Sequence, residues 1–289
     1  MADNWVDGYT FTNNIRMHYV TNGEGRLMVL LHGFPEFWYS WRFQIGALGQ
    51  HFKVVAPDLR GYNETDKPEG VENYKIEILL QDILGLIKNL GAEKAIVVGH
   101  DWGGALAWEF AKSFPEMTDR LIVLNCPPIS VLQEEIAKNK VQARRSQYIF
   151  FFQQPQIPEQ TMSANDYAML KSTWRDMAIK KELWDDETVA KYVEALKLPA
   201  LSCGINYYRA SFQYPVRAKQ RRLKVKCPTL VIWGEQDKAL GKELTQYFPE
   251  IVDAPYTIKF IPEIGHWVQQ EAPELVNSYI LEFLQKGFP

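Results

Sequence analysis

The stretch from Ala95 to Lys112 constrains the fold of this chain more than any other. Its first part, residues 95–98, is a short apolar run of the kind that forms a buried strand. Its last part, residues 105–112, has apolar side chains at helical spacing. Between them lies Gly-x-Asp-x-Gly-Gly, with glycines where a Cβ atom would clash in a sharp turn. We therefore expect a strand-to-helix turn that holds Asp101 above the edge of a sheet.

Short apolar runs alternate with helical patterns along the first 130 residues. An antiparallel pair that turns at Asn13-Asn14 comes first. The strands expected after it are residues 27–31, 52–56, 95–98 and 121–125, with a helix over residues 74–90. Strands that alternate with helices at this spacing predict the α/β class, with a mostly parallel, doubly wound sheet.

The pattern changes in the second half of the chain. Only helical patterns occur at first, over residues 134–152, 165–180, 187–196 and 200–212. Strands over residues 229–233 and 256–261 and a helix over residues 271–285 follow. We interpret residues 1–130 and 216–289 as one α/β core domain, and residues 131–215 as an all-helical insertion. Two consecutive domains are the alternative.

Asp101 stands where a turn of this kind usually carries serine. A carboxylate is ionised at neutral pH without help, because the ordinary pKa of Asp is about 3.9. It is suited to displace a leaving group from a saturated carbon, which leaves an alkyl ester on the enzyme. Asp101 is therefore a candidate nucleophile toward an epoxide or a carbon that bears a halide. The alternative is an ordinary tight turn in which Asp101 caps the helix.

An ester on Asp101 needs a base that activates water, and the base needs a partner that orients it. Of the five histidines, only His266 lies in a loop at the exit of a late strand. Asp237 follows the preceding strand, and such strand ends meet at one edge of a doubly wound sheet. We predict that Asp101, Asp237 and His266 act as nucleophile, acid and base. Taken singly, an Asp at the position of Asp237 is more often a turn residue, and a His at the position of His266 is more often a hydrogen-bonded surface-loop histidine. The three residues together, each at a strand end, favour the catalytic interpretation.

Hydrolysis of the ester also needs an oxyanion hole made of backbone N–H groups. The loop after Leu31 can supply one of them, from Phe34, and the residue after the nucleophile, Trp102, supplies the other. Their side chains are expected to form an apolar wall over the carboxylate. Plain core packing of Phe34 and Trp102 is the alternative, and it is compatible with both roles.

The chain resembles an epoxide hydrolase of the α/β-hydrolase superfamily over nearly its whole length. The resemblance rests on the turn His32–Pro35, Gly61-Tyr62 with Pro68, Gly99–Gly104, Asp237 and His266. It implies the α/β-hydrolase fold, with residues 131–215 as a helical cap, and it implies no metal or cofactor. It also implies opening of an epoxide to a vicinal diol through an aspartyl ester. Asn63 departs from the family pattern, where glycine is typical; because Asn tolerates positive φ, we expect only a locally altered turn.

In that family two cap tyrosines donate hydrogen bonds to the epoxide oxygen, and Tyr148 and Tyr208 match their positions. A phenol has a pKa of about 10, so it stays protonated at neutral pH and can donate as the C–O bond breaks. The choice of Tyr208 over its neighbour Tyr207 rests on the motif match alone. Without the resemblance, both are simply two of fourteen tyrosines on amphipathic helices.

Three other functions are compared with this one. A haloalkane dehalogenase uses the same Asp-His-Asp set, although many of these enzymes carry Asn at the position of Phe34. Haloacetate dehalogenases carry Arg at the position of Trp102. The last is a non-catalytic ligand receptor on the same fold, but such receptors often lack one residue of the set that this chain retains as Asp101, Asp237 and His266.

The composition limits the binding partners and the cellular compartment that we expect for this chain. The 289 residues carry a net charge of -3, which gives no electrostatic footprint for nucleic acid. Three widely spaced cysteines, Cys126, Cys203 and Cys227, form no disulfide or zinc pattern and favour a reducing cytoplasm. The N-terminus has no signal-peptide pattern, and no apolar run approaches the ~20 residues of a membrane span. We expect a cytoplasmic enzyme for a small apolar epoxide; the sequence leaves open whether it forms a homodimer.

Overall fold

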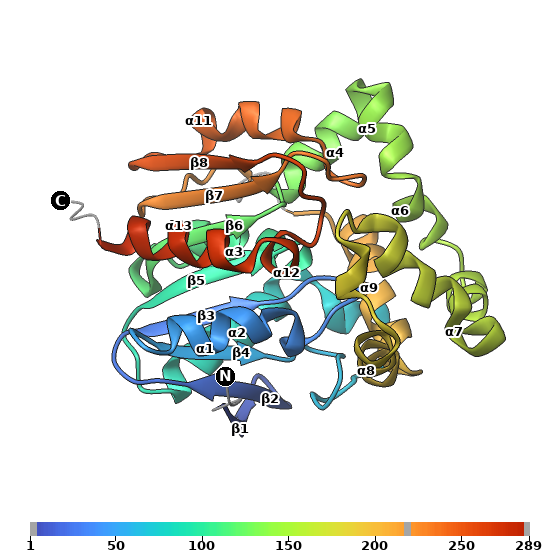
Figure 1. Ribbon diagram of the computed structural model, residues 1–289, viewed down its shortest axis with the longest axis horizontal. Helices are drawn as coiled ribbons and strands as arrows, with labels where there is room; N and C mark the ends of the chain where they lie inside the picture. Colours follow the sequence, from blue (N-terminus) through green and yellow to red (C-terminus); the bar gives the residue numbers. More distant parts are fainter. Residues whose placement is uncertain (1–4, 217–220, 286–289) are drawn as a thin grey trace.

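The computed structural model describes residues 5–216 and 221–285, and these form a sheet of eight strands with helices around it (Figure 1). The strand order is β1-β2-β4-β3-β5-β6-β7-β8. The strands are β1 (Val6–Thr12), β2 (Ile15–Asn22), β3 (Leu27–Leu31), β4 (Lys53–Pro57), β5 (Ala95–His100), β6 (Thr118–Leu124), β7 (Thr229–Gly234) and β8 (Tyr256–Ile261). The expectation about a signal peptide depends partly on residues 1–4, which lie outside the described residues.

The pairing of the strands confirms the predicted fold class. β2 pairs antiparallel with both β1 and β4, and every other pair of neighbours from β4 to β8 is parallel. The predicted turn between β1 and β2 lies at Asn13 and Asn14, which have φ of 43° and 63°. Positive φ at both central residues is typical of a two-residue hairpin turn whose twist matches that of the strands.

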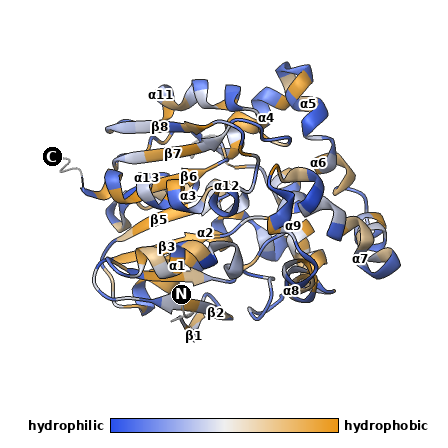
Figure 2. Ribbon diagram, in the orientation of Figure 1, coloured by the Kyte–Doolittle hydropathy of each residue, from blue (hydrophilic) through white to orange (hydrophobic). Residues whose placement is uncertain are grey.

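The parallel strands β3, β5 and β7 are buried on both faces because their side chains alternate between two cores. In β3, Val29 and Leu31 face one apolar cluster, while Met28 and Leu30 face the other. Figure 2 shows the resulting hydrophobic colour along β5 and β7. Helices α2 (Ile76–Asn89), α3 (Trp102–Ser113) and α11 (Phe248–Ile251) contribute to the first cluster. Helices α1 (Arg42–Leu48), α12 (Val268–Glu271) and α13 (Pro273–Gln285) contribute to the second.

Between β6 and β7 the described residues form helices and no strand, and this helical segment lies beyond the carboxyl ends of the parallel strands (right side of Figure 1). Its helices are α4 (Ile129–Lys138), α5 (Lys140–Arg145), α6 (Gln147–Phe151), α7 (Ile157–Met177), α8 (Asp186–Leu196) and α9 (Ala200–Gln213). Short 3-10 helices occur at η1 (Trp38–Trp41), η2 (Val71–Tyr74), η3 (Pro115–Met117), η4 (Lys181–Leu183) and η5 (Lys242–Tyr247). β6 and β7 pair with each other, so the strands on both sides of the helical segment belong to one sheet.

Two helices of this segment differ from the sequence-based expectation. The helix expected over residues 134–152 is three helices, because Asn139 has extended φ and ψ and its side chain accepts a hydrogen bond from the Val141 N–H. That bond caps α5 and competes with a continuous helix. The helix expected from residue 165 begins at Ile157, with Pro158 in its first turn, and residues 164–167 interrupt it with non-helical backbone.

Candidate active site

The strand-to-helix turn after β5 holds Asp101 in a conformation that few residues adopt. Asp101 has φ 49° and ψ −122°, and it lies between β5 and the first residue of α3. The turn is tight enough that a Cβ atom on Gly99 would lie 2.1 Å from the Gly103 carbonyl oxygen. Within the described chain, the Asp101 side chain accepts no hydrogen bond from the N–H groups of α3. The alternative of a capping aspartate is therefore wrong, and the carboxylate faces elsewhere.

His266 and Asp237 reach Asp101 from the loops after β8 and β7. His266 Nδ1 lies 2.7 Å from Asp237 Oδ2, and His266 Nε2 lies 3.6 Å from Asp101 Oδ2. All three side chains are buried, so His266 is not the surface histidine of the alternative interpretation. Asp237 Oδ1 accepts the Ala239 and Leu240 N–H groups at 2.7 and 2.9 Å. Asp237 is thus a turn residue and the partner of His266 at once.

The electrostatics of these three groups depend on one another. Burial alone would raise the pKa of Asp101, but the hydrogen bond and charge of His266 outweigh it and lower that pKa. The pKa of Asp237 is lowered in the same way, against burial, by His266 and by its own N–H and amide donors. Burial lowers the pKa of His266, but the two carboxylates raise it well above its ordinary value. The arrangement stabilises an imidazolium between two carboxylates.

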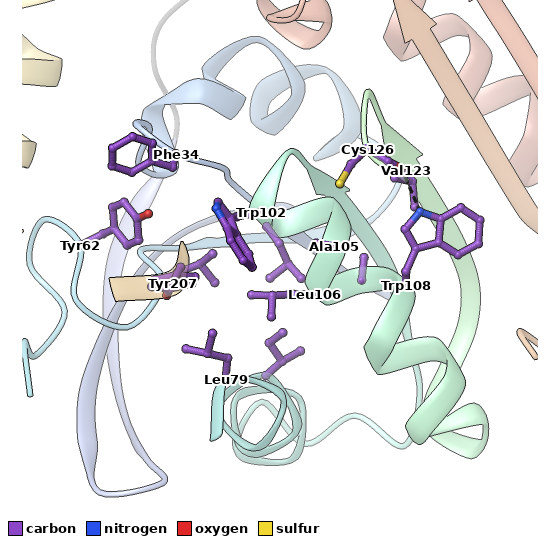
Figure 3. Packing of buried hydrophobic residues seen from close by; sticks show 14 of the residues in the cluster. Phe34, Tyr62, Leu79, Trp102, Ala105, Leu106, Trp108, Val123, Cys126 and Tyr207 are labelled. Carbon is purple, nitrogen blue, oxygen red and sulfur yellow. Dashed lines mark hydrogen bonds between the residues drawn. The ribbon is translucent and has the colours of Figure 1, made fainter. Parts of the chain in front are cut away.

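Phe34 and Trp102 both pack in the core beside Asp101, and their backbone N–H groups are the predicted oxyanion hole. The Phe34 N–H donates to Asp101 Oδ1 at 2.8 Å. Trp102 is the first residue of α3, where a backbone N–H has no acceptor within its own helix. The indole of Trp102 packs against Tyr207 and Tyr208, with ring centroids 5.6 and 5.0 Å apart. Figure 3 shows Trp102 and Tyr207 together with Phe34 and Tyr62.

The structure separates Tyr208 from its neighbour Tyr207. Tyr208 on α9 and Tyr148 on α6 lie with ring centroids 5.8 Å apart, and both line cavities that contain Asp101. Tyr207 points the other way, and its hydroxyl donates to the Arg60 carbonyl at 2.8 Å. Burial, followed by the charge of Asp101, raises the pKa of both Tyr148 and Tyr208 well above its ordinary value. Both phenols therefore stay protonated beside an ionised carboxylate.

Asp101 and the two phenols lie where two cavities meet. The larger has a volume of about 490 Å³ and is lined mainly by apolar side chains of α3, α4, α6 and α9. The smaller has a volume of about 240 Å³ and includes His266, Phe34 and three methionines of α7. Asp101, Tyr148 and Tyr208 are common to both linings. A ligand whose reacting atom touches Asp101 can thus extend in two directions.

Asn125 is a site residue that the sequence analysis missed. It follows β6, has φ 41°, and its Nδ2 donates to Asp237 Oδ2 at 2.8 Å. Its Oδ1 accepts the Gly234 N–H at 2.8 Å, so it links the ends of β6 and β7 beneath the acid. Asn125 lies directly after a buried strand, as Asp237 does, and the rule that identified Asp237 would also have identified Asn125.

Glu36 and His100 form a second layer that was also missed. His100 Nδ1 lies 2.8 Å from Glu36 Oε2, and His100 Nε2 lies 2.8 Å from the His266 carbonyl oxygen. Glu36 accepts the Gly33 N–H and the side-chain amides of Gln269 and Gln270. The His100 ring thus lies between the Glu36 carboxyl group and the His266 carbonyl group. The pair ties the loop of the predicted base to the loop that carries Phe34.

Residues 5–216 and 221–285 contain no group of three or more His, Cys, Asp or Glu side chains that could hold a metal ion. In the same part of the chain no helix combines the length and apolar character needed to cross a membrane.

Comparison with known proteins gives the class that the fold and the site define. The family model of the alpha/beta hydrolase fold matches residues 26–273, and the chain belongs to this family. Within it, several relatives of the chain are named epoxide hydrolases. It is 41 % identical to epoxide hydrolase 1 of Caenorhabditis elegans, over 99 % of this chain and 72 % of that protein. It is 40 % identical to epoxide hydrolase 4 of Homo sapiens, over 95 % of this chain and 77 % of that protein.

Solved structures lead to the same group. The crystal structure of Bacillus megaterium epoxide hydrolase in complex with an inhibitor is similar to this chain with a TM-score of 0.88. The two sequences are 32 % identical, and the match covers 96 % of this chain and 100 % of that one. Epoxide hydrolase VrEH1 from Vigna radiata matches with a TM-score of 0.87 at 29 % identity, over 99 % of each chain. The protein is a hydrolase of the epoxide hydrolase group, as the sequence analysis predicts.

Proposed function

We propose that this protein opens a small apolar epoxide to a vicinal diol through an ester of Asp101. The observation that carries the proposal is the placement of two protonated phenols, Tyr148 and Tyr208, beside an ionised carboxylate where two cavities meet. An epoxide needs both groups at once, because a nucleophile attacks its carbon while its oxygen takes a proton. The names of the relatives support the same substrate class.

In the first step the Asp101 carboxylate attacks an epoxide carbon. A C–O bond to Asp101 forms, the C–O bond of the ring breaks, and its electron pair goes to the epoxide oxygen. That oxygen receives a proton from Tyr148 or Tyr208, whose raised pKa keeps them protonated until the negative charge develops. The Phe34 N–H holds one oxygen of the nucleophile in place.

In the second step His266 activates a water molecule against the ester carbonyl. Ester formation removes the charge of Asp101, which is one of the two charges that raise the pKa of His266. The imidazolium therefore loses its proton more readily in the ester than in the free enzyme. That proton returns to the tyrosinate left by the first step, and the neutral His266 ring can then act as a base. Asp237 orients the ring through Nδ1, His266 takes a proton from the attacking water, and the N–H groups of Phe34 and Trp102 receive the oxyanion. When the oxyanion collapses, the bond between the carbonyl carbon and the diol oxygen breaks, that oxygen takes the proton from His266, and the diol leaves. The Asp101 carboxyl group then gives its proton to His266, which restores the free enzyme.

Residues 131–215 are proposed to act as a cap, with residues 1–130 and 216–289 as the core domain. Tyr148 and Tyr208 both come from this helical segment, whereas Asp101, Asp237 and His266 come from strand ends of the sheet. Substrate is proposed to bind between the two, where the cavities lie. A reducing cytoplasm is the proposed compartment, and the three buried free thiols of the described chain support it.

The intact mass of a His266→Gln variant tests the proposal. Without its base the enzyme should accumulate the ester, so incubation with styrene oxide should add the mass of the whole epoxide, mapped to Asp101. An Asp101→Asn variant should gain nothing. An adduct only from a bromoalkane, without its bromine, would assign the protein to the haloalkane dehalogenases. If neither reagent nor a wider panel of epoxides labels Asp101, the proposed chemistry is wrong and a binding function replaces it.

A further inference from the structure

Arg209 is a buried arginine that joins three helices of the helical segment. It directly follows Tyr208 on α9. Its Nε–H donates to the Phe152 carbonyl at 3.0 Å, just past the end of α6. Its guanidinium pairs with both carboxylate oxygens of Glu159, in the first turn of α7. One side chain therefore fixes α6, α7 and α9 relative to one another.

The hydrogen bonds of Arg209 use the full capacity of its side chain. Beyond Phe152 and the two oxygens of Glu159, the Gln154 carbonyl accepts at 2.7 Å and Asn206 Oδ1 at 3.4 Å. These are five acceptors for the five N–H groups of a guanidinium. A lysine has three donors and no planar fork, so it cannot reproduce the set. The geometry is specific for arginine.

The anchored carbonyl belongs to a residue that packs against both phenols. The ring of Phe152 lies 5.9 Å from that of Tyr148 and 4.9 Å from that of Tyr208, between centroids. The Phe152 N–H also donates to the Tyr148 carbonyl at 3.0 Å, so the two residues share one helical turn. Arg209 thus holds α6 through Phe152 and α9 through its own backbone, and Tyr148 and Tyr208 are the side chains that these helices present.

We propose, on the basis of the function proposed above, that Arg209 is a positioning residue that sets the two phenols against the epoxide oxygen. Because the phenols act on the epoxide and not on the ester, Arg209 governs the rate of ester formation. It leaves the rate of ester hydrolysis unchanged, since that step uses His266, Asp237 and the backbone N–H groups. A purely structural residue would slow both steps or neither.

Rapid-quench mass spectrometry with excess enzyme over styrene oxide measures the two rates separately. We expect Arg209→Lys to slow ester formation by about 10- to 100-fold, the effect of misplacing a reacting group by about 1 Å, with ester hydrolysis at the wild-type rate. Arg60→Lys is the matched control, because Arg60 also forms a buried ion pair, with Asp82, and also donates to a backbone carbonyl. It should lower thermal stability without changing either rate.

Two further variants keep the test decisive. If Arg209→Lys does not fold, Glu159→Gln leaves the bonds to Phe152 and Gln154 in place and should produce a smaller loss in the same step. In a Tyr148→Phe/Tyr208→Phe background, Arg209→Lys should change ester formation no further, because its effect acts through the phenols. Ester formation at the wild-type rate in the folded variant, equal slowing of both steps, or a full effect without the phenols would overturn the inference. If the wild-type enzyme forms no ester, the proposed function itself fails.

Discussion

At the scale of single residues, the site depends on charges that stabilise one another in a buried environment. His266 lies between Asp101 and Asp237, and its positive charge lowers the pKa of both carboxylates while they raise its own. None of the three could hold its charge alone, because burial opposes every one of them. The arrangement of these three charges therefore makes a contribution to stability that depends on pH.

The sign of that dependence follows from the raised pKa of His266. Since the folded-state pKa lies above the ordinary value of about 6.5, the stability from His266 is fully present below about pH 6.5 and is lost as the pH rises through the folded-state pKa. The difference in Tm between wild type and His266→Gln should therefore be larger at about pH 6 than at about pH 9.5. An equal difference at both values would contradict a charged His266.

The tyrosine pair gives a second prediction. Tyr148→Phe or Tyr208→Phe should slow ester formation by about tenfold, since the other phenol still donates, and the double variant by about 10²- to 10⁴-fold. Tyr207→Phe is the internal control, because its hydroxyl bonds to the Arg60 carbonyl away from the cavities. It should cost about 1 kcal/mol of stability and leave single-turnover rates intact. A double variant with the wild-type rate would remove the phenols from the mechanism.

At the scale of elements, the position of α9 depends on a close approach to the loop after β3. A Cβ atom on Gly204 would lie 2.8 Å from Phe34 Cδ2 and 3.0 Å from the Tyr62 hydroxyl oxygen. Gly204 lies one helical turn before Tyr208, on the same side of α9. The glycine therefore sets how closely α9 brings its phenol to the Phe34 loop.

Two opposite effects compete in a Gly204→Ala variant. Alanine gains about 1 kcal/mol of helix propensity over glycine, whereas overpacking a buried contact costs about 1–3 kcal/mol. We expect the cost of overpacking to exceed the gain in helix propensity, so the Tm should fall. Ester formation should slow by about tenfold, because Tyr208 moves away from Asp101. Gly46→Ala in α1 is the control, because nothing lies within 4 Å of its added Cβ. It should raise Tm and leave activity unchanged; a similar gain at Gly204 would contradict the close approach.

The sequence predicts the strands and helices that neighbouring residues determine, through the spacing of apolar side chains. Parallel strands place their carboxyl ends at one edge, so Asp101, Asp237 and His266 could be grouped from their positions after strands alone. The boundaries of the helices in residues 131–215 are predicted less well. The Asn139 cap and the break at residues 164–167 depend on a side-chain hydrogen bond and on backbone angles, which the spacing of apolar residues does not reveal. Glu36, His100 and Arg209 were missed for a related reason. Their hydrogen-bond partners lie on other elements, and the spacing of residues in the sequence does not indicate such contacts.

At the scale of the whole molecule, the proposed reacting groups lie at the junction of two unequal cavities between the sheet and the helical segment. About 490 Å³ extends toward α4, and about 240 Å³ extends toward α7. The difference orients a substrate, because a bulky substituent on the epoxide fits the larger space and a small one fits the smaller. The residues of α4, rather than those of α7, should then determine which sizes of substrate the protein accepts.

Filling each cavity with one large side chain tests this division. Ile136 on α4 lines the larger cavity and Thr173 on α7 lines the smaller one. Ile136→Trp should lower kcat/KM for phenyl glycidyl ether by about tenfold or more, because the pocket loses more than the volume of one methylene. It should spare propylene oxide, which needs neither space. Thr173→Trp should leave both substrates nearly unaffected, since each places only a hydrogen or a methyl group on that side. A larger loss from Thr173→Trp than from Ile136→Trp would reverse the orientation, and the bulky arm would then lie against the methionines of α7.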